Sequence, residues 1–327
     1  MSAFDLHYER WEGSHTSIWA RRITIAANGL RLTLQGKLVR FTLSTSGSIG
    51  LALALAMFLL GQFLVADSVV TDLVANASGE IKQIAIGITA WLEMNPDVSV
   101  GVSHNLLFFY YSKAFCFFSL LAVLFVMPNL ITQDLASSAM IIYTSKAVGR
   151  MDYLIGKFLS VFSMVGIAWF LPMAGAWVLG NFMSPRWHFF YYSLGALWNL
   201  TVVFLIVGSV ISLIALALSS LSNNPKKVSG QLLGLVAIGL VAHQMASEEI
   251  IPSWLRFASL THDVLQVNSW AFDAAGSLEL ARERIPMFGS LPVGRPMAEP
   301  EIGGALIGLG CMGALSVYIL NRRTRIQ

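Results

Sequence analysis

The chain has 327 residues, of which 56% are hydrophobic and only 12% are charged, and its mean hydropathy is +0.67. An average soluble domain carries about 25% charged residues, so these values exclude a soluble globule, and the apolar content excludes a disordered chain. A multi-pass membrane protein remains, and a net charge of +3 is too small to indicate a nucleic-acid partner.

The first 43 residues form a charged N-terminal segment without the early apolar run of a signal peptide. Within it, apolar residues recur at steps of three and four over residues 18–41, which predicts an amphipathic helix. We expect this helix to lie in the inner membrane interface, with Arg21, Arg22 and Arg31 near anionic lipid. It would serve as a surface anchor or, in addition, as a docking surface for a cytosolic partner.

Six stretches are long and apolar enough to cross a hydrocarbon core of ~30 Å as helices. They lie near residues 44–65, 106–131, 154–179, 189–221, 231–245 and 302–320. The fifth is the shortest, and Pro172 lies inside the third. We therefore expect an all-α polytopic membrane protein, in which a six-helix transmembrane domain over residues 44–327 follows the segment 1–43.

The distribution of Lys and Arg predicts the orientation of this domain. If the N-terminus is inside, the inner segments hold fourteen basic residues and the outer segments hold six. Because inner loops are enriched in Lys and Arg, both termini are predicted to be cytoplasmic, with the domain in the cell inner membrane.

The two long outer loops are predicted to carry short helices. Residues 66–105 include a second amphipathic stretch at 70–92. Prolines interrupt residues 246–301, so we expect short helices near 253–267 and 270–284, followed by an extended part. Residues 246–301 are thus predicted to form a small outer cap before the last span.

Motifs of catalysis and of nucleotide binding are missing from the sequence. It contains no G-x-x-x-x-G-K-[ST] phosphate loop, no H-E-x-x-H and no G-x-S-x-G. Acids are nearly absent from the predicted spans, which argues against a proton-coupled carrier, and Lys113 is expected to extend its ammonium to the interface. His243, Met245 and His262 could approach one another around a soft metal, but their spacing matches no metal motif.

The inner loop at 132–154 is the most informative stretch of the chain. Its pattern predicts a short amphipathic helix over 133–143 that is capped by Thr132 and ended by Gly149. Asp152 is expected to cap the next helix, and Gly156 to let that helix pack closely. A short helix joined rigidly to two spans at the cytoplasmic surface is suited to receive force from a cytosolic motor.

This loop resembles that of the ABC-2 type exporter permeases, with the closest similarity to the branch grouped with permeases for copper-enzyme maturation. The family pattern has an acid after the second span, small residues, Tyr-x-Ser-Arg-Pro, a basic residue with Tyr close behind, and Gly-Lys. The matching residues here are Asp134, Ser138, Ala139, Tyr143, Ser145, Arg150, Tyr153, Gly156 and Lys157. Lys146 and Ala147 stand where the family usually has Arg and Pro.

The resemblance implies a non-catalytic membrane subunit that works as a dimer with a second copy or a homologous permease. It implies that a separate cytosolic ATPase binds ATP and Mg²⁺, and that this chain holds no cofactor or metal. The residues implied to dock that ATPase are Asp134, Leu135, Ile142, Tyr143, Ser145, Lys146, Arg150 and Tyr153. Two alternatives stay open: a structural or assembly subunit that keeps the permease fold without transport, and a membrane enzyme, which the missing motifs disfavour.

Overall fold

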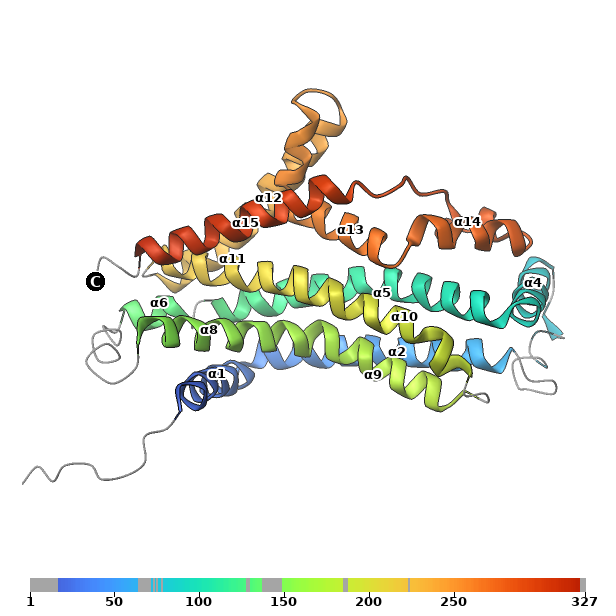
Figure 1. The fold of residues 1–327 in the computed structure, drawn as a ribbon, viewed down its shortest axis with the longest axis horizontal. Coiled ribbons are helices and arrows are strands. Elements are labelled where there is room, and N and C mark those ends of the chain that lie inside the picture. The colour runs from blue at the N-terminus through green and yellow to red at the C-terminus, as the bar shows by residue number, and fades with distance from the viewer. Residues whose placement is uncertain are drawn as a thin grey trace, which may run out of the picture.

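The computed structural model describes residues 17–63, 72–127 except 73, 75 and 78, 130–136, 149–184, 188–222 and 224–323. This part of the chain is all-α and contains no strand. Six of its helices are long and apolar enough to cross a membrane, and they form an elongated bundle (Figure 1). The protein is therefore built as a multi-pass membrane protein, as the composition indicates.

Each predicted span lies on one of these six helices. Single helices form the first, second, fifth and sixth spans: α2 (Lys37–Gln62), α5 (Pro96–Val126), α12 (Pro225–Ser247) and α15 (Ile302–Arg323). The third span comprises α8 (Arg150–Val165), a π-helical turn η2 (Gly166–Phe170) and α9 (Leu171–Phe182). The fourth comprises α10 (His188–Val203), the π-helical turn η3 (Phe204–Gly208) and α11 (Ser209–Ser220).

The interruption of the third span is explained by Pro172. Proline has no backbone N–H, so it cannot donate to the carbonyl of Ala168 four residues earlier, and η2 lies just before it. The hydroxyl of Ser46 on α2 donates to that carbonyl oxygen at 2.6 Å. Gly50, one turn further along α2, leaves the room that Pro172 needs, because a Cβ there would lie 2.9 Å from the proline Cβ. The interruption of the third span thus determines which residues of α2 can pack beside it.

The N-terminal helix is shorter than predicted. It is split from the first span at Gly36, whose backbone is extended, so α1 (Ile18–Leu34) ends before α2 begins at Lys37. The prediction of one amphipathic helix over 18–41 is therefore wrong at its C-terminal end, and the expected boundary at residue 43 falls inside α2. Figure 1 shows α1 beside α8 at one end of the bundle, turned away from the direction of α2.

The loop elements divide between the far end and the flank of the bundle (Figure 1). At the far end lie α4 (Glu80–Met94) and α14 (Ala274–Arg284), and Gly87 of α4 packs directly on Pro286. By contrast α13 (Leu260–Ala271), which follows the 3₁₀ turn η4 (Ser253–Ala258), packs along α15. After two short 3₁₀ turns, η5 (Phe288–Ser290) and η6 (Pro292–Gly294), the chain is non-helical up to α15.

The two short helices predicted for this second loop are confirmed, with different bounds. Ser259 separates η4 from α13, and Asp273, with a left-handed φ of 45°, separates α13 from α14. α4 begins at Glu80 after Gly79, whose φ is +65°, and therefore later than the amphipathic stretch predicted at 70–92.

Candidate functional site

The loop at 132–154 leaves the bundle through a short helix, α6 (Ile131–Ala136), and returns at the start of α8. Of the predicted contact residues, Ile142, Tyr143, Ser145 and Lys146 lie outside the described residues, as does the side chain of Leu135. Asp134, Arg150 and Tyr153 lie inside them. The described part of the site is therefore the set of residues at the two ends of the loop, on α6 and at the start of α8, together with their contacts on other helices. We call this set the frame.

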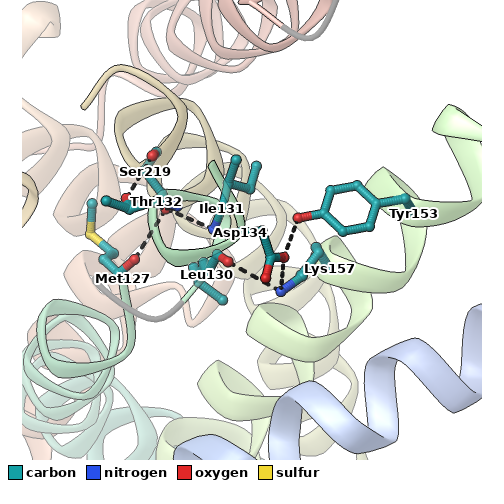
Figure 2. Close-up of polar contacts among 8 residues, drawn as sticks. All are labelled: Met127, Leu130, Ile131, Thr132, Asp134, Tyr153, Lys157 and Ser219. Carbon is teal, nitrogen blue, oxygen red and sulfur yellow. Dashed lines mark hydrogen bonds and ion pairs between the residues drawn. The ribbon is translucent and has the colours of Figure 1, made fainter. Parts of the chain in front are cut away.

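Three residues of the predicted motif form one polar cluster at this frame. The Lys157 ammonium lies 2.8 Å from Asp134 Oδ2, and the Tyr153 hydroxyl donates to the same oxygen at 2.5 Å (Figure 2). Lys157 also donates to the carbonyl oxygen of Leu130 at 3.1 Å. Tyr153 and Lys157 are one helical turn apart on α8, so both reach α6 from the same face.

Ser219, in the last turn of α11, holds the start of α6. Its Oγ accepts from the backbone N–H groups of Ile131 (3.0 Å) and Thr132 (3.2 Å) and donates to the carbonyl of Met127 (3.1 Å). The Thr132 hydroxyl in turn donates to the Ser219 carbonyl at 2.7 Å (Figure 2). The prediction that Thr132 caps this helix is therefore wrong, because α6 begins at Ile131 and a residue of another span satisfies its first donors.

The start of α8 is joined to α1 and α15 by charged side chains. Arg22 Nε donates to Asp152 Oδ1 at 2.7 Å, and Arg150 donates to the Asn321 carbonyl (2.7 Å) and side-chain oxygen (3.1 Å). The N-cap of α8 is Gly149, so the prediction that Asp152 caps this helix is wrong. Asp152 lies in the first turn, where a negative charge stabilises the helix dipole and also pairs with Arg22.

The prediction of close packing at Gly156 is confirmed. A Cβ on Gly156 would lie 2.7 Å from the Cβ of Ile25 and 3.2 Å from the Arg22 carbonyl oxygen, both on α1. Gly29 of α1 approaches α8 in the same way, with Ser160 Oγ at 2.6 Å from the position of its missing Cβ. Arg22, one of the three predicted interface arginines, forms an ion pair with Asp152 of α8, whereas Arg31 is exposed in the last turn of α1.

The two ion pairs are partly shielded from water. The side chains of Lys157 and Asp134 are 13% and 17% exposed, and those of Arg22 and Asp152 are 19% and 15% exposed. Shielded pairs hold their geometry better than exposed pairs, because solvent screens them less. The frame therefore connects α1, α6, α8, α11 and α15 into one unit.

Sequence reasoning found the acid and the two α8 residues of this frame, and it missed Ser219, Asn321 and the pairing of Arg22 with Asp152. The two residues in each of these contacts are 87 to 171 positions apart, so no local pattern predicts them. Among the described residues, no three His, Cys, Asp or Glu side chains are placed to hold a metal ion. His243 and His262 do meet, but as stacked rings with centroids 4.4 Å apart.

Replacing Ser219 by alanine should destabilise the bundle by about 2 kcal/mol, because two buried N–H groups lose their acceptor. Ser220 is the matched control: it is equally buried, but its hydroxyl bonds only to the Ala217 carbonyl of its own helix. Thermal unfolding of the purified protein measures both variants. Equal losses from Ser219→Ala and Ser220→Ala would contradict the capping role of Ser219.

No protein-family model matches the chain, and no curated protein is detectably similar to it. The function is therefore inferred from the arrangement of the frame. The frame presents polar contacts between helices rather than a nucleophile with an adjacent base. Its chemistry suits mechanical connection between the loop and the spans.

Proposed function

We propose that this chain is the transmembrane permease subunit of an ABC-2 type exporter, which moves an unidentified substrate when a separate cytosolic ATPase drives it. The single observation that supports this most is the frame around α6 and α8. A loop that receives force must be tied to the spans on both sides, or the force would only bend the loop.

The frame provides such ties. Asp134 joins α6 to α8 through Lys157 and Tyr153, and Ser219 joins α6 to the fourth span. Arg150 extends the connection from the start of α8 to the end of α15. A push on the segment between α6 and α8 would therefore reach the third, fourth and sixth spans together.

The charges at this end support a cytoplasmic location. Arg322 and Arg323 end α15, Lys227 lies at the start of α12, and Arg150 and Lys157 lie at the start of α8. Because Lys and Arg favour the inner side, this end is assigned to the cytoplasm of a cell inner membrane, with both termini inside. α4 and α14, at the opposite end in Figure 1, would then form the extracytoplasmic cap.

α1 fits a helix that lies in the inner interface. Trp19, Ile23 and Leu32 are exposed on it, although its other side packs on α8. The Arg22 guanidinium lies 4.7 Å from the Trp19 ring centre, so charge and aromatic surface occur together at the level expected of lipid headgroups.

In this proposal the other components of the transporter are separate chains. ATP and Mg²⁺ are bound by the ATPase, and a second copy or a homologous permease completes a dimer. The chain itself is not an enzyme and holds no cofactor.

The test is co-purification of a cytosolic ATPase with wild-type and variant chains at equal expression. The sequence pattern makes Ile142 and Tyr143 apolar anchors, so the Ile142→Asp/Tyr143→Ala double variant should recover at least about tenfold less ATPase. The matched control is Met94→Asp/Tyr191→Ala, which changes exposed residues on α4 and α10. It should recover the wild-type amount.

Undiminished recovery with the loop variant would refute ATPase docking through this segment. Retention of other membrane proteins and no ATPase by the wild-type chain would favour the structural or assembly role instead.

A further inference from the structure

Asp263 of α13 is the most unusually placed acid in the described chain. It is 0% exposed and lies against Gly308 of α15. A Cβ on Gly308 would lie 2.3 Å from Asp263 Oδ2 and 2.5 Å from the Phe257 carbonyl oxygen. The carboxyl group therefore occupies space that any other residue at position 308 would fill, and the contact between α13 and α15 is built around it.

Neither oxygen of this carboxyl group has a hydrogen-bond partner. Asp263 Oδ1 and Oδ2 are both buried and unsatisfied, and so are His262 Nε2 and His243 Nδ1 close by. A buried carboxylate without donors is strongly unfavourable, whereas the protonated acid carries no net charge and can donate its own hydrogen. The surroundings thus favour the protonated form.

No cation in the packed elements offsets a negative charge on Asp263. α10 has no Asp, Glu, Lys or Arg, and α15 has none before Arg322. Arg256 of η4 pairs with Glu301, and Lys113 of α5 lies over the rings of Phe109 and Tyr110 at 3.9 and 5.0 Å. Other charged or titratable groups on these elements include Lys226 and Lys227 at the start of α12, Asp97 in the first turn of α5, and the exposed Glu279, Arg282, Glu283 and Arg284 of α14. The histidines are His104 on α5, which contacts the Val100 carbonyl, His262 on α13 itself and His243 on α12.

His262, the neighbour of Asp263, is kept neutral as well. Burial, together with His243 and Arg256, lowers the pKa of His262 to about 4. Burial raises the pKa of Asp263 to about 8. Transfer of the proton from the acid to the histidine would create two buried charges, so the neutral pair is the stable one.

We propose that Asp263 is a proton-binding site at the junction of α13 and α15, and that loss of its proton opens this junction. The site goes beyond docking of an ATPase and does not depend on it. It also changes the expectation that proton-binding groups are absent from the bundle, because α13 lies along a span although it is not one of the six.

Hydrogen bonds connect α13 to the core of the bundle, so separation of α13 from α15 would affect other helices. Asn268, further along α13, accepts from the Ser112 hydroxyl of α5 at 2.5 Å, and Ser112 accepts from the Trp169 ring N–H of η2 at 3.2 Å. All three residues are buried. Movement of α13 away from α15 would therefore disturb the second and third spans.

The test compares the unfolding temperature of the purified full chain in lipid nanodiscs between about pH 5 and about pH 9 for wild type, Asp263→Asn and Asp273→Asn. The asparagine at 263 imitates the protonated acid, and Asp273, exposed at the other end of α13, is the matched control. Because burial raises the pKa of Asp263 from 3.8 to about 8, the stability it supplies is fully present only below pH 3.8 and is lost as the pH rises from there through about 8.

We expect the unfolding temperatures of wild type and Asp273→Asn to fall with rising pH, and that of Asp263→Asn to fall less. In infrared spectra, wild type should also show a protonated-carboxyl band at about pH 6 that is lost by about pH 9 and is missing from Asp263→Asn. Equal pH dependence of wild type and Asp263→Asn, or no such band in wild type, would overturn the proposal. Recovery of the wild-type unfolding temperature at high pH by Na⁺ but not by choline would overturn the assignment to a proton.

Discussion

Replacing Gly156 by valine should detach α1 from α8 and cost about 3 kcal/mol. The Cβ alone would lie 2.7 Å from both Cβ and Cγ2 of Ile25, and 3.2 Å from the backbone oxygen of Arg22. Ile25 is branched at Cβ and the other contact is a main-chain oxygen, so rotation of a side chain cannot relieve either contact. The helices must separate, and the Arg22–Asp152 pair, at 2.7 Å, separates with them.

Hydrogen exchange of the α1 amides measures this detachment, and we expect exchange at least about tenfold faster than in wild type. Gly175→Val is the matched control, because Gly175 lies in α9 of the same span and a Cβ there meets no atom within 4 Å. It should leave exchange in α1 unchanged. Unchanged exchange in Gly156→Val would show that α1 does not depend on this contact.

The positions of the six spans could be predicted because they depend on a local property, the length of an apolar run. The helix break at Gly36 could not, because Leu34, Leu38 and Phe41 continue the helical spacing across it. A glycine inside an apolar period is a weak stop signal, and only the structure shows that its backbone is extended here. The role of Ser46 was equally hidden, since it depends on which helix lies beside Pro172.

At the frame, the sequence could group Asp134 with Tyr153 and Lys157, because they belong to one local motif. Its two capping predictions are wrong for different reasons. The first donors of α6 are satisfied by Ser219 from a distant span, and the N-cap of α8 is Gly149, three residues before Asp152.

The loop helices show what cannot be predicted from the length of apolar runs alone. Residues 246–301, which include α13, are predicted to form an outer cap because prolines interrupt them. In the structure α13 packs along α15, and Asp263 becomes buried at that contact. The scarcity of acids in the spans therefore did not reveal that an acid is buried beside a span.

Removing the Lys157 ammonium should destabilise the frame as strongly as the change at Gly156. Lys157→Met removes the ammonium from the Asp134 carboxylate, which is 17% exposed, and keeps the hydrogen bond from the Tyr153 hydroxyl. Breaking a buried pair on one side costs about 3–5 kcal/mol, and we expect about 3 because this pair is only partly shielded. Asp134→Asn should cost less, since the ammonium keeps the Leu130 carbonyl and can reach water.

The Asp134→Asn/Lys157→Met double variant distinguishes the stability that comes from the charge–charge attraction from the stability that comes from side-chain packing. With both charges gone, no unpaired charge is left, so its loss of stability should be smaller than the sum of the two single losses by about 1–3 kcal/mol. Glu301→Gln, which removes one partner of the more exposed Arg256–Glu301 pair (32% and 48%), should cost under about 1 kcal/mol. Denaturant unfolding in mild detergent measures all four variants. Additive single losses, to within about 0.5 kcal/mol, would mean that the two side chains act independently and that the pair does not tie α6 to α8.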